Sequence, residues 1–154
     1  MVQEIPTDEL DEMLENTKPD QLNTYFQQNK DYMADDKKAF YYYMKDVLEQ
    51  KRIKLKDVYS FADVTDSYGE QILEMQKHTR NRDLILRFCI AGHFSLVETN
   101  RALKLYGMSE LYAKDRRDAC IIVAINRRIF DLADIDDMLI SQGLKKITKA
   151  AAEE

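Results

Sequence analysis

Glycine and proline are scarce in this chain, which has four Gly and two Pro among 154 residues. Both prolines lie before position 20, so none interrupts the rest of the sequence. The chain also lacks alternating runs of Val, Ile and Thr bounded by turn pairs, the pattern that indicates β-strands. The sequence therefore predicts an all-α fold.

Apolar residues recur at helical spacing, and capping residues indicate where the helices begin and end. Ser95 is a typical N-cap, and Gly107 follows the same segment as a helix-ending glycine does. With these signals we expect helices over residues 8–16, 21–29, 37–51, 55–62, 66–75, 82–94, 96–106, 114–127 and 132–142.

Charge is distributed unevenly along the chain, whose net charge is −5. Residues 1–36 hold ten acidic residues and two lysines, a charge of −8, whereas residues 51–94 hold eight basic and six acidic residues, a charge of +2. We expect an acidic helical N-terminal arm over 1–36, a helix-turn-helix domain over 37–107, a helical extension packed on it over 108–144, and a flexible tail over 145–154.

The composition gives little from which to build an enzyme. There is no Gly-rich phosphate loop, no Ser or Cys nucleophile in a recognisable setting, and no metal-ligand spacing. His78 and His93 are too far apart to form an i, i+4 ligand pair. Cys89 and Cys120 lie in predicted helices and are interpreted as small buried side chains. We expect no catalysis, no cofactor and no metal.

The sequence also gives an expectation for the compartment. The longest apolar run, Ala119 to Ile125, is far shorter than the roughly 20 residues that span a bilayer. Acidic residues at Glu4, Asp8 and Glu9 do not fit a signal peptide. We expect a cytoplasmic protein without a membrane partner.

Residues 55–87 have the layout of a helix-turn-helix, in which two short helical segments are separated by a tight break and followed by a basic loop. Thr65 or Asp66 is a good N-cap for the second segment. Apolar residues on one face of each segment are expected to share a small core. These inner residues are Val58, Phe61, Ala62, Val64, Tyr68, Ile72 and Met75.

Burying that inner face leaves polar side chains of the second segment pointing outward, where a recognition helix meets base edges in a major groove. Gln71 could pair with adenine, Glu70 could accept from cytosine N4, and Ser67 could bond to either base type. The phosphate contacts are expected from basic residues on either side of the two segments. They are Lys54, Lys56, Lys77, Arg80 and Arg82.

At these residues the chain resembles a known family. The order Thr65, Ser67, Tyr68, Gln71, Ile72, a basic loop and Arg82-Asp83 is similar to lambda-repressor-like helix-turn-helix regulators of bacteria, of the xenobiotic-response-element type. The resemblance extends through 96–107 and 111–119 and covers roughly residues 37–144. It implies a five-helix helix-turn-helix domain with extra helices at both ends, acting as a bacterial transcription regulator on double-stranded DNA. A homodimer is compatible with that expectation.

A function of a different class is also compatible with the sequence. Asp66, Glu70 and Glu74 place three carboxylates on the face that should approach DNA, although DNA affinity comes mainly from phosphate neutralisation. In this alternative the helix-turn-helix fold no longer binds DNA, and the acidic arm or the helices of 108–144 bind a protein partner. The basic loop favours the first function and the carboxylates favour the second.

Two smaller features have more than one interpretation. Gly69 lies inside the second segment, where glycine costs about 1 kcal/mol relative to alanine, so we expect this helix to be less rigid than its relatives. The run Arg116-Arg117-Asp118 could hold a partner's carboxylate or phosphate, or form a structural ion pair and cap. We favour the structural interpretation.

The acidic arm has two possible positions. It could pack on the helix of 37–51 through Leu22, Tyr25 and Phe26, or it could lie over residues 77–82 and compete with phosphate. We favour the packed arrangement.

Overall fold

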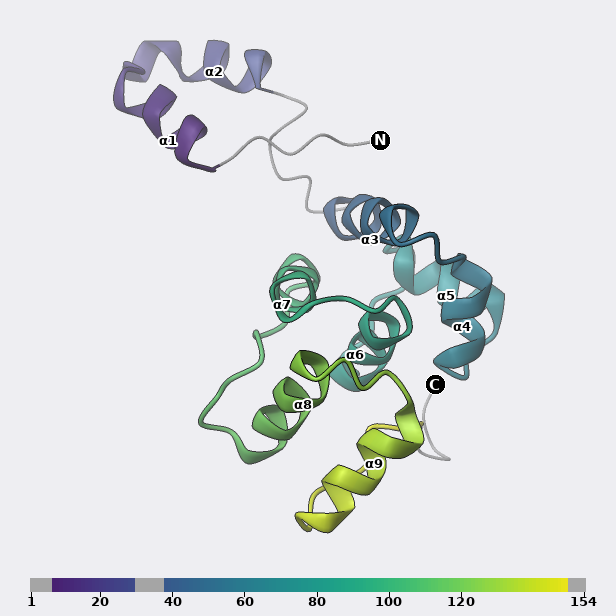
Figure 1. The fold of residues 1–154 in the computed structure, drawn as a ribbon. Helices are drawn as coiled ribbons and strands as arrows, with labels where there is room; N and C mark the ends of the chain where they lie inside the picture. The colour runs from purple at the N-terminus through teal and green to yellow at the C-terminus, as the bar shows by residue number, and fades with distance from the viewer. Residues whose placement is uncertain (1–6, 30–37, 150–154) are drawn as a thin grey trace.

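A computed structural model of the chain describes residues 7–29 and 38–149. Every regular element in this part is helical, as the sequence predicts (Figure 1). The elements are α1 (Thr7–Glu15), a short 3-10 helix η1 (Pro19–Gln21), α2 (Leu22–Gln28), α3 (Ala39–Gln50), α4 (Leu55–Phe61), α5 (Asp66–Leu73), α6 (Arg82–Ala91), α7 (Leu96–Leu105), α8 (Arg116–Asn126) and α9 (Leu132–Ser141).

Three corners of the fold share one backbone conformation. After α3, α4 and α6 the chain passes through a C-cap residue, a residue with positive φ, an apolar residue and the N-cap of the next helix. The positive-φ residues are Arg52 (φ 59°), Asp63 (φ 62°) and His93 (φ 56°). The amide of the apolar residue then bonds back into the preceding helix, as Val64 does to the Tyr59 carbonyl at 3.1 Å. The α4–α5 corner is therefore one of a set and does not by itself indicate DNA binding.

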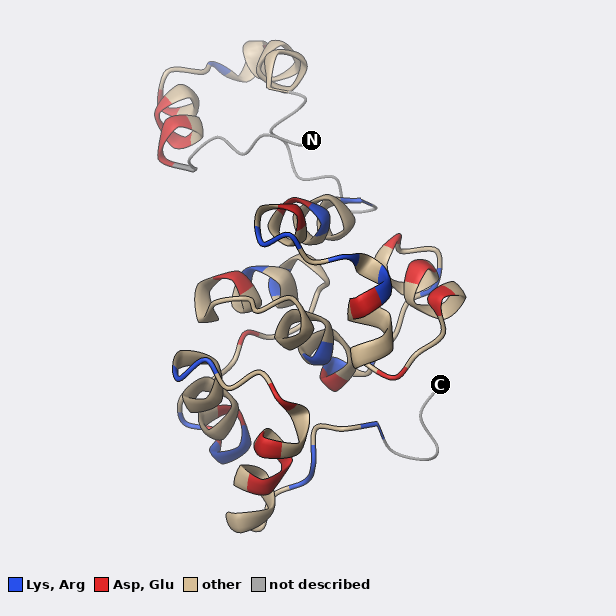
Figure 2. Ribbon diagram, turned by 45° about the vertical axis from the view of Figure 1, so that its right-hand side comes forward, with Lys and Arg blue, Asp and Glu red and all other residues tan. Residues whose placement is uncertain are grey.

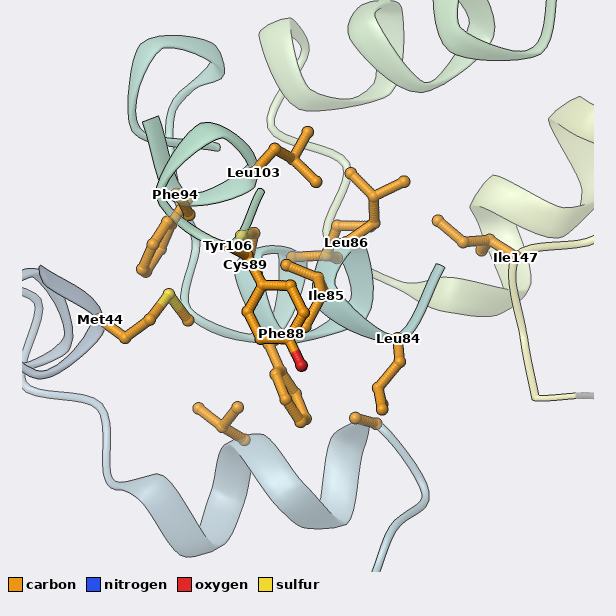
Figure 3. Packing of buried hydrophobic residues seen from close by; sticks show 14 of the residues in the cluster. Met44, Leu84, Ile85, Leu86, Phe88, Cys89, Phe94, Leu103, Tyr106 and Ile147 are labelled. Carbon is orange, nitrogen blue, oxygen red and sulfur yellow. The ribbon is translucent and has the colours of Figure 1, made fainter. Parts of the chain in front are cut away.

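Helix α6 is the centre of the core and is covered on opposite sides by α4 and α7 (Figure 1). The sequence predicts Leu84, Ile85, Phe88 and Cys89 on its inner face, and all four are buried. Leu86, Arg87 and Ile90 are buried as well, which the sequence analysis missed. A one-sided apolar stripe is expected of a surface helix, whereas a central helix is enclosed all round (Figure 3).

The residues after α9 form a C-terminal strap, residues 144–149, that packs on the body of the protein. Ile147 is fully buried, and the Asp136 carboxylate accepts a hydrogen bond from its amide at 2.8 Å. Arg117 donates to the carbonyls of Lys145 and Lys146 at 3.0 and 2.8 Å. The expectation of a flexible tail is therefore wrong for residues 145–149, because these contacts come from residues distant in sequence. Residues 150–154 lie outside the described part.

Arg87 joins this strap to the corner between α4 and α5. Its side chain is 1% exposed and donates to the carbonyl of Ile147 at 2.9 Å and to that of Ala62 at 3.3 Å. Lys149 donates to the neighbouring Asp63 carbonyl at 3.2 Å. These bonds satisfy carbonyl groups at the C-terminal end of α4, which lack partners within the helix.

Residues 7–29 form a separate N-terminal hairpin of α1, η1 and α2. Tyr25 is 7% exposed, and its ring contacts the Phe26 ring edge-on with 5.7 Å between the ring centres. Leu22 and Phe26 were also expected to face inward, but they are 41% and 46% exposed. The expected packing on α3 is therefore wrong for Leu22 and Phe26, and the ring contact of Tyr25 lies within the hairpin itself.

None of the described helices is long and apolar enough to cross a membrane. Within the same residues, no group of three or more His, Cys, Asp or Glu side chains is arranged to hold a metal ion.

Candidate nucleic-acid interface

Helix α5 presents a polar face to solvent and an apolar face to the core. Thr65 caps its N-terminus, since its hydroxyl accepts a hydrogen bond from the Tyr68 amide at 3.1 Å. Ile72 is fully buried, as the sequence predicts. Ser67 and Glu70 are exposed, whereas Gln71 is partly buried at the edge of the polar face. The structure thus places the three expected base-contacting residues on or beside the outer face of one helix.

Gly69 brings α5 unusually close to α4. A Cβ atom built on Gly69 would lie 2.3 Å from Cδ1 of Tyr59, so the Tyr59 ring rests directly on the helix at this position. Helix propensity alone predicts that Gly69 makes α5 less rigid, but here the missing side chain makes room for the buried Tyr59 ring. The contact predicts a well-packed α4–α5 pair, opposite to the loosening expected from helix propensity alone.

Tyr59 is 2% exposed, and its hydroxyl has no hydrogen-bond partner in the described part of the chain. Burial raises the pKa of Tyr59 above its ordinary value, and the negative charges of Glu70 and Glu74 raise it further. The phenol therefore stays neutral beneath the acidic edge of α5.

Four of the five expected phosphate-contacting residues are exposed. Lys54 and Lys56 lie at the start of α4, and Lys77 and Arg80 lie in the connection between α5 and α6. The Lys77 ammonium is 5.5 Å from the ring centre of Tyr68 on α5. The two pairs therefore come from segments on either side of α5 in the sequence.

The connection between α5 and α6 is held in place by Tyr106 at the end of α7. The Thr79 amide donates to the Tyr106 hydroxyl at 2.9 Å, and the His78 ring stacks on the Tyr106 ring with 4.8 Å between the ring centres. Tyr106 itself packs edge-on against Phe40 of α3, with 4.8 Å between ring centres. Tyr106 thus holds the backbone segment that carries Lys77 and Arg80. The sequence alone did not predict this role of Tyr106.

Arg82, the fifth expected phosphate contact, is engaged within the protein. Its guanidinium donates to both carboxylate oxygens of Asp118 at 2.7 and 3.0 Å, and to the carbonyls of Ser109 and Glu110. Burial raises the pKa of Asp118, but hydrogen bonds from Arg82 and the Tyr112 amide outweigh it and hold this pKa below its ordinary value. A side chain with this many internal bonds is not available to a phosphate group, and we omit Arg82 from the interface.

A second pair lies beside the first. Arg117 donates to both carboxylate oxygens of Asp83 at 2.8 and 2.9 Å. The sequence Arg82-Asp83 at the start of α6 is therefore paired crosswise with Arg117-Asp118 at the start of α8. This confirms that Arg117 and Asp118 form structural ion pairs, whereas the cap of α8 is Asp115, whose carboxylate accepts a hydrogen bond from the Asp118 amide at 2.9 Å.

These pairs change the charge balance around α5. Of the eight basic residues in 51–94, Arg82 is paired with Asp118, Lys51 is paired with Glu98 at 2.9 Å, and Arg87 is buried. Five cations remain at the surface, Arg52, Lys54, Lys56, Lys77 and Arg80. With Asp83 paired to Arg117, five carboxylates remain too, those of Asp57, Asp63, Asp66, Glu70 and Glu74. Among these surface groups of residues 51–94, the excess of positive charge expected from the sequence is therefore absent.

A scan of protein-family models, a search of curated proteins and a search of solved structures each found no match to this chain.

Proposed function

We propose that α3–α7 form a lambda-repressor-like helix-turn-helix domain and that the protein is a DNA-binding regulator that inserts α5 into a major groove. The observation that carries this proposal is the outer face of α5, where Ser67 and Glu70 are exposed and Gln71 lies at the edge. Exposed lysines at the start of α4 and exposed basic residues after α5 accompany this face. A recognition helix needs this combination of groups that bond to base edges and groups that bind phosphate.

The anchoring of the α5–α6 connection supports the same proposal. Phosphate contacts fix the register of a protein on a duplex, so they are most effective on a rigid backbone. Tyr106 provides that rigidity to the segment that carries Lys77 and Arg80, through its hydroxyl and its ring. The bidentate pair of Arg82 with Asp118 then fixes the start of the next helix.

The balanced charge has a definite consequence for binding. With equal numbers of surface cations and carboxylates in residues 51–94, weak binding to random DNA is expected, because nonspecific affinity comes from phosphate neutralisation. Four phosphate contacts, at Lys54, Lys56, Lys77 and Arg80, correspond to a slope of about −3.6 in a plot of log affinity against log salt for one protein chain. Base contacts would then supply most of the discrimination.

The proposal is tested by a fluorescence-anisotropy titration of the full chain against fragments of its own genome at two salt concentrations. A fragment that binds far more tightly than random DNA, with a salt dependence near that slope, supports it. The variant Glu70→Gln should strengthen binding to random DNA, since it removes a carboxylate that faces the polyanion. Failure to bind any fragment at low salt contradicts the proposal.

The carboxylates of Asp66, Glu70 and Glu74 favour one other function, a protein-interaction module on the same helices. In that case α5 would attract a basic partner surface and would repel DNA. Binding of a defined polycation such as polylysine, abolished in the variant with all three carboxylates replaced by amides, together with absent DNA binding, would select this second function.

A further inference from the structure

The N-terminal hairpin carries apolar side chains that remain exposed in the described part of the chain. Met13 and Leu14 of α1 and Leu22 and Phe26 of α2 are 41–46% exposed. Helices of nine and seven residues are marginally stable alone, so most of their stability must come from packing. The exposed apolar side chains are therefore the expected place for a further packing partner.

Charge indicates what kind of surface that partner presents. Residues 7–29 hold six acidic residues against Lys18, a charge of −5, and Figure 2 shows the acidic residues along α1. Glu9 and Glu12 flank Met13 at helical spacing. A fitting surface is apolar at its centre, cationic at its edge, and free of carboxylates.

The outer face of α7 has this chemistry. Val97, Arg101 and Lys104 are spaced four and three residues apart, so they lie along one side of the helix, and all three are exposed. Val97 is 79% exposed, a high value for an apolar side chain. The acidic residue of this helix, Glu98, is turned to Lys51 at 2.9 Å. The face therefore combines one exposed apolar group with two cations.

The position of α7 suits an exchange of hairpins between two chains. The Phe40 ring at the start of α3 packs on Tyr106 at the end of α7, so the chain enters its helical body close to this helix. Residues 38–149 hold 20 basic and 16 acidic residues, a charge of +4 that opposes the −5 of the hairpin. Two copies could thus place each hairpin on the α7 of the other by a two-fold arrangement.

We propose that the N-terminal hairpin packs on the outer face of α7 in a second copy of this chain. Met13, Leu14, Leu22 and Phe26 surround Val97, and the carboxylates of α1 lie opposite Arg101 and Lys104. The occupant is a second copy because each copy carries both complementary parts, the hairpin with its charge of −5 and the body, residues 38–149, with its charge of +4. The interface does not depend on whether the protein binds DNA.

The test uses the full chain, prepared both unlabelled and with ¹⁵N, mixed, and treated with a carbodiimide that joins carboxylates to lysine amines in direct contact. Lys104 is the lysine of α7, so crosslinks from α1 to Lys104 are expected to join labelled to unlabelled chains. Lys51 and Glu98, 2.9 Å apart, provide an internal control that joins groups within one chain. Light scattering should give the mass of two chains.

Val97→Asp should abolish those crosslinks and weaken dimerisation by at least about tenfold, because it sets a carboxylate against carboxylates. An acidic residue in the first turn of α7 is compatible with the helix, so the fold should persist. Val123→Asp on α8 is the matched control, since Val123 is 51% exposed and lies outside this face. The proposal is overturned if the crosslinks to Lys104 form only within single chains, or if they survive Val97→Asp. It is also overturned if no crosslink to Lys104 forms while the control crosslink between Lys51 and Glu98 does.

Discussion

Arg82 at the start of α6 and Asp118 in the first turn of α8 form a bidentate ion pair, with 2.7 and 3.0 Å between guanidinium nitrogens and carboxylate oxygens. The two residues are 36 positions apart in the sequence. The pair connects the helices next to α5 with the C-terminal helices, and it uses a basic side chain that the sequence had suggested for DNA. Its structural role leads to the first prediction.

Asp118→Asn should destabilise the protein by about 2 kcal/mol at pH 7, because it leaves the half-buried Arg82 without its charged partner. The pKa of Asp118 is lowered in the folded protein, so this pair stabilises above the unfolded pKa of about 3.9 and is lost as pH falls through the folded value. The difference in the free energy of unfolding between wild type and variant, measured by urea unfolding, should therefore shrink below about pH 4. If this difference in the free energy of unfolding were the same at pH 7 and pH 3, the ion pair of Asp118 with Arg82 would not be its cause.

Gly69→Ala should destabilise the protein by about 2 kcal/mol although alanine favours helices, because the added methyl group would overlap the Tyr59 ring. Thermal unfolding of Gly69→Ala, Tyr59→Leu and the double variant would separate the two effects. We expect the alanine to cost much less when Tyr59 is already replaced by leucine. Additive effects of the two changes would exclude the close contact as the cause.

Tyr106→Phe should loosen the connection between α5 and α6 while leaving the core intact. The change removes the acceptor of the Thr79 amide, a bond worth about 1 kcal/mol, and retains the ring that packs on Phe40. Hydrogen exchange at the Thr79 amide should become faster by about fivefold, whereas Leu103 and Phe88 amides should keep their protection. His78→Ala is a useful comparison, since it removes the stacked ring and keeps the hydrogen bond.

If the protein binds DNA as we propose, two kinds of contact should respond differently to substitution. Gln71→Ala should cost about 1–3 kcal/mol on a specific site and relax the preference at one base, because a bidentate contact is lost. Lys77→Ala and Arg80→Ala should weaken all sequences about equally and reduce the salt slope by about one. Arg82→Ala should leave the salt slope unchanged once its effect on folding is accounted for. Equal effects of Gln71→Ala on specific and random DNA would contradict the base contact.

Local signals in the sequence located most helices and their caps. Thr65 and Ser95 are N-caps, and Gly107 ends α7 with a φ of 86°. These signals work because a cap bonds to an amide two or three residues away, so the neighbouring sequence contains both partners. The ends of α5 and α6 were placed too late, because Met75 and His93 adopt positive φ without being glycine.

The candidate interface was only partly predictable. Ser67 and Glu70 are exposed because the apolar spacing of α5 fixes which side faces inward. Whether a basic side chain lies at the surface or is bonded within the protein does not follow from such a spacing. Arg82 and Lys77 are both basic residues near α5, yet one is held by Asp118 and the other lies at the surface.

By itself, the sequence determined that the chain is helical, where its helices lie and which side of α5 faces the core, because each depends on residues within one or two helical turns. Only the tertiary structure decided that α6 is enclosed, that Arg87 is buried and that residues 145–149 pack as a strap. The bonds of Arg87 alone join groups 25 and 60 positions apart in sequence. The buried charge of Arg87 is tolerated because the carbonyls of Ala62 and Ile147 accept its hydrogen bonds, and no local pattern encodes that these groups meet.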